Sequence, residues 1–336
     1  MCLYPLNGFW TGTYTDNGKK DFIVVDGKTK LLSFTRFQKL YKKAHKYDLR
    51  QFHQFDGELY LTDPVAIPCG RCIECRLSYS RDWALRCVLE SQDHEFNYFL
   101  TLTYDNSYLP ANGSLVKKDV QLFIKRLRKY IDSHVGSYNI KYFLCGEYGE
   151  HSHRPHYHLL LFNCPLPCLV PLHDNLFVSE PLFKLWPFGS HVIGDVTFES
   201  AAYVARYVMK KCNSSSLVFD SSVEPEFVLM SRRPGIGKNY FDSHYDRIYK
   251  LDSIYLARYG IPLRFKPPRY FDRLYEKIDS DFLSSVKAER LAFSKSSSRA
   301  SFLHIGETID SYDISLVNHH VEYLKTHRLK LLVRTL

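Results

Sequence analysis

The sequence contains no long apolar run. The longest apolar stretches among its 336 residues, such as residues 159–162, fall far short of the roughly 20 apolar residues that a helix needs to span a bilayer. The first ten residues also lack a charged region followed by a long apolar one, so we expect no signal peptide. These absences argue against a membrane protein and predict a cytoplasmic location without a membrane partner.

The usual nucleotide-binding loops are missing as well. The sequence has no phosphate-binding Gly-Lys-Thr loop, and Gly235-Ile236-Gly237 lacks the third glycine of a dinucleotide site. It also has no internal repeat. We therefore expect neither a P-loop nucleotide hydrolase nor a repeat protein.

Charge and aromatic content favour a polyanionic partner. Lysine and arginine outnumber the acidic residues by 45 to 36, and aromatic residues make up 15% of the chain. Single-stranded nucleic acid suits this mixture, because its phosphates attract cations and its bases stack on flat rings. Many soluble proteins carry a similar charge, however, and most of the rings are expected in the core.

Hydrophobic periodicity predicts an α+β fold with a central antiparallel β-sheet flanked by helices. The predicted helices cover residues 76–94, 117–131 and 199–211, and the predicted strands cover residues 97–104, 139–145, 157–162 and 191–198. Three segments follow: an N-terminal segment, 1–95, with a cysteine cluster and a helix; a strand-rich core, 96–240; and a mainly helical C-terminal region, 241–336. We expect short strands or irregular structure before residue 66 and a loop at 294–298.

One predicted strand carries a pair of histidines. Side chains alternate between the faces of a strand, so His156 and His158 share a face, with Cα atoms roughly 6.6 Å apart. If residues 148–155 close a hairpin, Glu147 lies directly across from His156 on the same face. Two imidazoles and a carboxylate are suitable ligands for Mg²⁺ or Mn²⁺. A lone strand histidine is usually structural. The nearby His151 and His153 are expected to be solvent-exposed or to face the substrate.

The predicted helix 199–211 carries two tyrosines one turn apart. Tyr203, Tyr207 and Lys210 share one face with Arg206, and the opposite face holds small apolar residues, namely Ala201, Val204, Ala205 and Val208. A phenol has a pKa of about 10, so it attacks a phosphate only with the help of a metal ion or a cation such as Lys210. Taken alone, the two tyrosines could equally pack at the edge of the core.

Three closely spaced cysteines predict a metal site. Cys69, Cys72 and Cys75 supply three thiolates, and Cys2 is the candidate fourth ligand of a structural Zn²⁺ ion. The alternative is one or more free buried thiols. A basic turn, Arg232-Arg233-Pro234-Gly235, is a candidate for phosphate contacts, although a solvated turn is an equal alternative.

These residues resemble the HUH endonucleases, whose fold is a central antiparallel sheet of the RRM-like kind. Residues 99–104 resemble their first motif and His156-Tyr157-His158 the second, although tyrosine is an atypical middle residue. Tyr203 to Lys210 resembles the two-tyrosine third motif of rolling-circle initiators. The likeness is greatest to the replication initiators of microviruses, specifically the gokushoviruses of intracellular bacteria such as Chlamydia, and the segments that carry it are residues 1–5, 68–76, 146–149 and 231–237.

The resemblance implies a definite reaction cycle in the cytoplasm of a bacterial host. Such a protein binds the viral origin, melted to single-stranded DNA within the duplex replicative form, and nicks one strand. A tyrosine stays attached through a 5′-phosphotyrosine, and the ends are later rejoined to release a circular single-stranded genome. Glu147, His156 and His158 would bind the divalent ion, and the C-terminal region would recruit a host helicase and other replication proteins.

Two other interpretations stay open at this point. A relaxase or transposase of the same superfamily would use the same chemistry, although paired tyrosines favour replication. A zinc-stabilised nucleic-acid-binding protein without nuclease activity would need the histidine strand only for structure.

Overall fold

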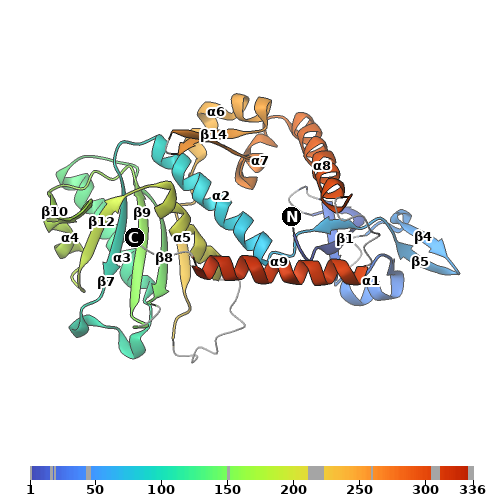
Figure 1. Ribbon diagram of the computed structural model, residues 1–336, viewed down its shortest axis with the longest axis horizontal. Helices are drawn as coiled ribbons and strands as arrows, with labels where there is room; N and C mark the ends of the chain where they lie inside the picture. The colour runs from blue at the N-terminus through green and yellow to red at the C-terminus, as the bar shows by residue number, and fades with distance from the viewer. Residues whose placement is uncertain are drawn as a thin grey trace. The chain divides into compact units, whose positions relative to one another are not determined.

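The computed structural model describes residues 2–15, 18, 20–42, 47–149, 152–210, 223–258, 260–303 and 311–331 (Figure 1). Side chains at 206–210, 258, 294–303, 311–315 and 329–331 lie outside the described part. The chain forms two compact units, which we call the terminal unit, residues 1–76 with 309–335, and the central unit, residues 77–308. The division at 95/96 and 240/241 expected from the sequence stays a prediction.

The central unit is built on a seven-stranded antiparallel sheet. Its strands, in the order in which they lie across the sheet, are β10 (Leu169–His173), β11 (Leu176–Ser179), β12 (His191–Asp195), β7 (Asn97–Thr103), β9 (Pro155–Phe162), β8 (Lys141–Tyr148) and β13 (Phe227–Met230). The α+β class and the antiparallel sheet expected from the sequence are thus confirmed. Of the strands expected in this unit, each is present within a few residues of its predicted bounds.

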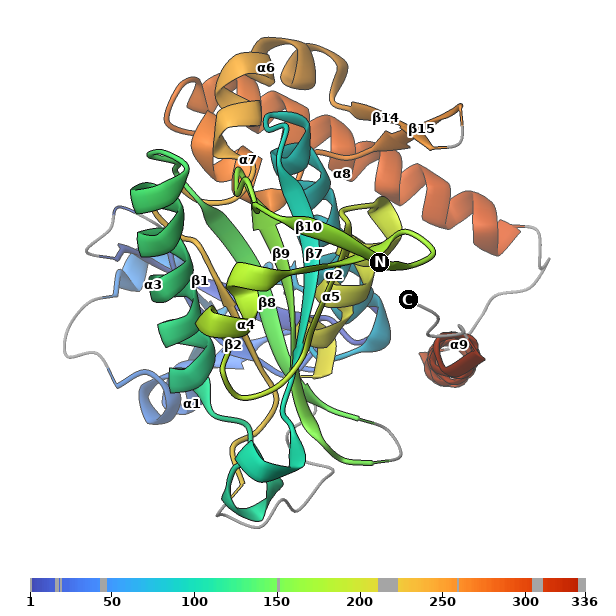
Figure 2. The ribbon, with the colours of Figure 1, turned by 90° about the vertical axis from the view of Figure 1, so that its left-hand side faces the viewer.

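Helices cover both faces of this sheet. The helices α3 (Lys117–His134) and α4 (Glu180–Leu185) pack on one face, and α5 (Phe198–Lys210) packs on the other together with the part of α2 (Ile73–Gln92) that belongs to the central unit (Figure 2). The α3 residues on the predicted apolar stripe are all buried: Val120, Phe123, Ile124, Leu127 and Ile131. The amphipathic pattern therefore identified the buried face correctly.

A buried charged group fixes α2 to the sheet. Glu90 on α2 forms an ion pair with Lys141 on β8 at 2.7 Å, and the backbone N–H of Gly237 donates to the same carboxylate at 2.6 Å. Both charged side chains are almost fully inaccessible, with 0% and 2% of their surfaces exposed. Because a buried charge is costly without a partner, this pairing defines where α2 lies on the sheet.

The last part of the central unit differs from the expected helical tail. It consists of α6 (Lys238–Leu251), a hairpin of β14 (Ile254–Arg258) and β15 (Ile261–Phe265), α7 (Arg269–Tyr275) and α8 (Ser280–Leu303). The loop expected at 294–298 was wrong, because α8 continues through it. Serine is only a weak helix former, but residues 281–303 contain no glycine or proline to break the helix.

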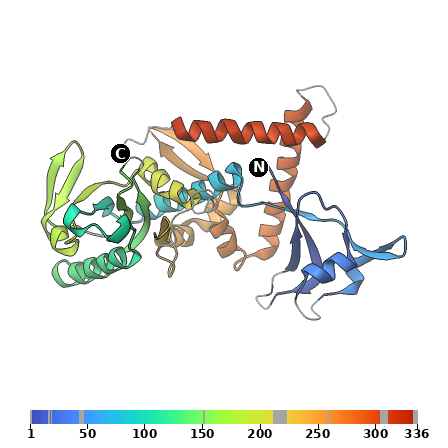
Figure 3. The same ribbon diagram turned by 90° about the horizontal axis from the view of Figure 1, so that it is seen from below.

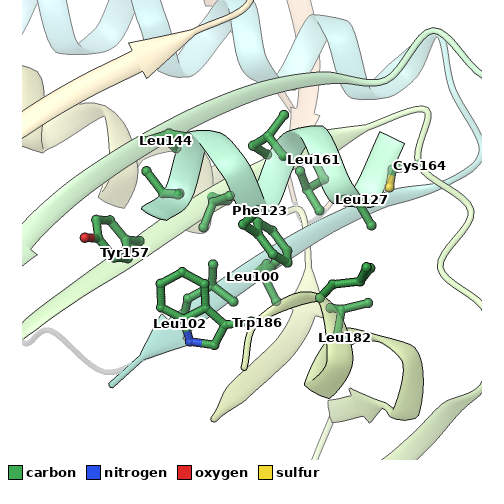
Figure 4. Packing of buried hydrophobic residues seen from close by; sticks show 14 of the residues in the cluster. Leu100, Leu102, Phe123, Leu127, Leu144, Tyr157, Leu161, Cys164, Leu182 and Trp186 are labelled. Atoms are coloured by element: carbon green, nitrogen blue, oxygen red, sulfur yellow. The ribbon is translucent and has the colours of Figure 1, made fainter. Parts of the chain in front are cut away.

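The core between the sheet and α3 contains Tyr157, the residue between the two histidines. Figure 4 shows its ring with Trp186, Phe123 and Leu102 in this cluster. Its hydroxyl group is also satisfied: it donates to the carbonyl of Val116 at 3.0 Å and accepts from the Val116 N–H at 2.9 Å. Burial raises the pKa of Tyr157 to about 12, which keeps the phenol neutral. A tyrosine thus replaces the usual aliphatic residue because its polar end has partners.

The terminal unit contains two small antiparallel sheets and two helices. One sheet has the order β2 (Lys20–Val25), β1 (Leu6–Tyr14), β6 (Val65–Ile67), and the other has the order β3 (Leu32–Ser33), β5 (Glu58–Leu61), β4 (Phe52–Phe55). The helices are α1 (Phe34–Leu40), seen beside these strands in Figure 3, and α9 (Ser311–Leu331). Asp56 and Gly57 both have positive φ, as a two-residue hairpin turn requires. The short strands expected here are therefore present.

In the part of the chain that the structure describes, no helix has the length and apolar character required to cross a bilayer.

The hydrogen bonds of Tyr157 yield a stability prediction. Tyr157→Phe removes the hydroxyl and leaves the buried Val116 backbone without its partner, so we expect a loss of about 1–3 kcal/mol in the free energy of unfolding. Urea unfolding followed by tryptophan fluorescence measures it, because the buried Trp186 lies beside Tyr157. Tyr108→Phe, at a ring that is 53% exposed, is the control and should change stability by less than about 0.5 kcal/mol. Equal effects of the two substitutions would contradict the account.

Candidate metal centre and tyrosine helix

The β8–β9 hairpin brings a carboxylate to the two histidines. In the antiparallel register Glu147 pairs with His156, and Cys145 pairs with His158. This is the register that the sequence predicts. Because directly paired residues point to the same side of a sheet, Glu147, His156 and His158 all face the layer that contains α5.

All three side chains meet at one oxygen atom. Glu147 Oε1 lies 2.6 Å from His156 Nε2 and 3.0 Å from His158 Nε2. The ligand atoms of the three residues lie within 4.8 Å of one another. The two imidazole rings are nearly perpendicular, at 87°, so their Nε2 atoms approach the carboxylate from different directions.

The second ring nitrogen of each histidine also has a partner. His156 Nδ1 lies 3.1 Å from the carbonyl oxygen of Arg154, and His158 Nδ1 lies 2.9 Å from the Thr101 hydroxyl. A carbonyl only accepts, so His156 must donate from Nδ1, and its Nε2 then carries a lone pair when the ring is neutral. A lone pair facing a carboxylate at this distance requires a positive charge between them. A proton or a metal ion supplies that charge.

Burial favours the neutral state that metal binding needs. The Glu147 and His158 side chains are 5% and 10% exposed, whereas His156 is 18% exposed and gives the more open side of the group. Burial lowers the pKa of His158, although the Glu147 carboxylate opposes this change. Phe99 stacks on the His158 ring with centroids 5.4 Å apart, which further limits its rotation. The group is therefore held rigidly before any ion binds.

The donor set fits a divalent ion. Neighbouring ligands around an octahedral ion at about 2.1 Å are roughly 3 Å apart, which is close to both Oε1–Nε2 distances. One oxygen and two nitrogen atoms on one side of an ion leave the other positions open for water or a substrate. Glu147, His156 and His158 could thus hold a metal ion.

The helix α5 starts at a fixed point beside this group. Thr197 and Ser200 bond reciprocally: the Ser200 N–H donates to Thr197 Oγ1 at 3.1 Å, and the Thr197 N–H donates to Ser200 Oγ at 2.8 Å. This pattern is a capping box and stabilises the first turn. The next residues that face the sheet are small and buried, namely Ala201, Val204 and Ala205. Small side chains let the helix lie close to the sheet.

Tyr203 lies directly at the metal-ligand group. Its hydroxyl donates to Glu147 Oε1 at 3.3 Å, and its ring meets the His158 ring edge-on with centroids 5.2 Å apart. Tyr207 and Lys210 belong to the same helix, which is described to Lys210. Their side chains, like that of Val208, lie outside the described part, so their positions relative to the histidines stay predictions.

Some residues that orient the site received no role from the sequence. Thr101 and Phe99 on β7 both contact His158, and the Arg154 carbonyl fixes His156. Their alternation along β7 could have identified them, because both belong to one face of a strand that pairs with β9. His153 is exposed in the hairpin turn, as expected, and His151 lies outside the described residues.

The four cysteines expected to bind zinc also lie together. The Sγ atoms of Cys2, Cys69, Cys72 and Cys75 lie within 4.8 Å of one another, so this second group could hold a metal ion as well. It belongs to the terminal unit, whereas the histidine group belongs to the central unit.

Comparison with known proteins gives consistent results. A family model for replication-associated proteins of the ORF2 type matches residues 97–212. The replication-associated protein ORF2 of Spiroplasma virus 4 is 37% identical over 269 residues, which are 74% of this chain and 82% of the relative. The replication-associated protein VP4 of Bdellovibrio phage phiMH2K is 32% identical over 68% of this chain and 75% of the relative. The replication-associated protein ORF4 of Chlamydia phage 1 is 33% identical over 74% of this chain and 63% of the relative.

No solved structure matches the chain. The matched segment 97–212 contains the histidine strand and the tyrosine helix, so the likeness includes the candidate site. These similarities define a viral replication-associated protein. The chain belongs to the family of replication-associated proteins of the microviruses.

The partner of His158 gives a test of the metal site. Thr101→Val keeps the shape of the side chain but removes the hydroxyl that orients the imidazole, so we expect divalent-ion affinity to fall roughly 10–100-fold. Mn²⁺ binding followed by electron paramagnetic resonance measures the free ion directly. Thr103→Val is the matched control, since Thr103 lies on the same strand face but bonds to Ser190. A similar loss in both variants, or none in Thr101→Val, would refute the assigned role.

Proposed function

We propose that the protein is a site-specific DNA endonuclease that starts rolling-circle replication by nicking one strand at the viral origin. The observation that carries the proposal is the shared contact of Tyr203, His156 and His158 with one carboxylate oxygen of Glu147. A tyrosine beside a metal-ligand group suits phosphoryl transfer better than a purely structural role, because structure alone does not need three polar groups at one buried acid. Membership in a family of replication-associated proteins agrees with it.

The metal ion would be Mg²⁺ or Mn²⁺, held by Glu147, His156 and His158. When bound, it would polarise the scissile phosphate and neutralise the charge that develops on its oxygens. The protein residues supply the rest. Thr101 and the Arg154 carbonyl keep the imidazoles oriented, so no energy is spent on rearrangement during the reaction.

Tyrosine is the proposed nucleophile. The phenolic oxygen of Tyr203 or Tyr207 forms a bond to phosphorus as the bond to the 3′ oxygen breaks. The phenol loses its proton, the 3′ oxygen leaves as a hydroxyl group, and the 5′ phosphate stays on the tyrosine. Unlike attack by water, this step conserves the phosphodiester energy in the covalent link. Lys210, one turn beyond Tyr207 on the expected face, is proposed to stabilise the phenolate.

The second tyrosine serves the end of the cycle. One tyrosine would hold the 5′ end during synthesis while the other attacks the regenerated origin. The free 3′ hydroxyl would then displace the first tyrosine and close a single-stranded circle. Two tyrosines one helical turn apart can approach one ion alternately, since they extend from the same face of α5.

DNA binding is proposed to rest on charge and rings. The chain has a net charge of +9, and Arg232 and Arg233 are both exposed on their turn, where phosphates can reach them. The reaction would take place in the cytoplasm of the bacterial host. A host helicase and other replication proteins are the proposed partners of the C-terminal region. A relaxase or transposase would share the chemistry, but family membership favours replication.

Capture of the covalent adduct tests this function. The DNA substrates are overlapping single-stranded oligonucleotides that tile the genome encoding the chain, labelled at the 3′ end so that the label stays on the fragment joined to tyrosine. With Mn²⁺ we expect one oligonucleotide to give a labelled species that survives boiling in detergent. Chelation of the metal should abolish it, and Glu147→Gln should slow its formation at least about 100-fold.

Tyrosine variants complete this experiment. The double variant Tyr203→Phe with Tyr207→Phe should form no adduct, because no phenol remains at the ion. Tyr255→Phe, at an exposed tyrosine of β14, is the matched control and should react normally. An adduct with the double variant would contradict the proposal. Complexes that dissociate in detergent for every oligonucleotide would instead support a zinc-stabilised DNA-binding protein.

A further inference from the structure

The cysteine group in the terminal unit has no part in the proposed nicking reaction. Three of its members, Cys69, Cys72 and Cys75, flank the start of α2, and Cys2 comes from the beginning of the chain. Cys2 Sγ and Cys72 Sγ are 3.8 Å apart. This distance is far longer than a disulfide bond of about 2.05 Å. The four sulfur atoms therefore surround a common point without bonding to each other.

The size of the group identifies the kind of metal. In a tetrahedral zinc site with Zn–S bonds of about 2.3 Å, neighbouring sulfur atoms are about 3.8 Å apart. The spacing Cys-x₂-Cys-x₂-Cys with a distant fourth cysteine also occurs around cubane iron–sulfur clusters, but there each sulfur binds a different iron, and the sulfurs are roughly 6 Å apart. All four Sγ atoms here lie within 4.8 Å of one another. The group fits one ion and is too small for a cubane.

The backbone is already arranged for thiolates. The N–H of Cys72 donates to Cys69 Sγ at 3.3 Å, and the N–H of Cys69 donates to Cys2 Sγ at 3.2 Å. Between them Gly70 has a φ of +72°, which a residue with a side chain adopts only with strain. This turn directs N–H groups toward sulfur, and such bonds stabilise the negative charge that a metal-bound thiolate carries.

We propose that Cys2, Cys69, Cys72 and Cys75 bind one structural zinc ion that joins both ends of the chain to the start of α2. With four protein ligands, the coordination is complete and no position stays open for catalysis. The ion is thus distinct in ligands and purpose from the one proposed at Glu147, His156 and His158.

The C-terminal helix α9 contacts the same region. Asn318 donates to the carbonyl of Leu3 at 2.8 Å, beside Cys2, and the N–H of Ile73, beside Cys72, donates to Glu322 at 3.1 Å. Lys325 also forms an ion pair with Glu74. The residues that α9 contacts are neighbours of zinc ligands, so loss of the ion would release the surface on which α9 rests. Zinc binding energy is then part of the folding energy of the terminal unit.

Zinc analysis of the full-length protein tests the inference. Protein purified without chelator, in the His156→Ala and His158→Ala background that removes the other candidate site, should contain about one zinc and no iron per chain. Cys72→Ser should reduce zinc to well below half an equivalent. Cys168→Ser is the matched control at an exposed free cysteine and should retain the full equivalent.

Two measurements on protein with intact cysteines guard against a misfolded variant. Replacement of zinc by Co²⁺ should give the intense visible bands of a tetrahedral cobalt thiolate. Removal of zinc by a chelator should speed hydrogen exchange in residues 316–328 of α9, with little change in the central sheet. No zinc and no cobalt spectrum in the intact protein, a full equivalent of zinc in Cys72→Ser, or iron in place of zinc would overturn the site. Unchanged exchange in α9 would overturn its dependence on the ion.

Discussion

The pairing of β8 with β9 is the constraint on which the rest of the candidate site depends. This antiparallel register places Glu147 opposite His156 and on the same face as His158. A shift by one residue would turn the carboxylate to the α3 side of the sheet, where it would be buried among apolar side chains. Burial of both faces prevents such a shift, since each alternate residue of β9 already packs in one of two cores. The site is therefore as well determined as the core itself.

Packing on the two faces of β9 serves two purposes. On the α3 side, Tyr157 completes the core and bonds to the Val116 backbone, which holds the strand in place. On the other side, the small residues of α5 let Tyr203 reach Glu147. A polar group of one carboxylate and two imidazoles is costly to bury, and the fold accepts this cost at one place only among the residues that the central unit describes. Such a site is a natural location for function.

The sequence predicts those features that depend on local periodicity. The histidine pair follows from the two-residue repeat of a strand, its carboxylate from a short hairpin, and α5 from a segment without glycine or proline. Other features depend on distant contacts. The role of Thr101 requires knowledge that β7 pairs with β9. The strand β10 is exposed and contains Pro171, so it lacks the alternating pattern, as edge strands often do. The helix through 294–298 was missed because serine predicts loops only statistically.

The central claim is that one divalent ion binds between Glu147, His156 and His158 beside Tyr203. Anomalous X-ray scattering from crystals grown with Mn²⁺ tests this claim most directly, since it locates the ion independently of activity. The account predicts one strong peak roughly 2.2 Å from Glu147 Oε1 and from both Nε2 atoms, with the phenol of Tyr203 nearby. A manganese ion bound by other residues, or no peak at this group in saturating Mn²⁺, would contradict it.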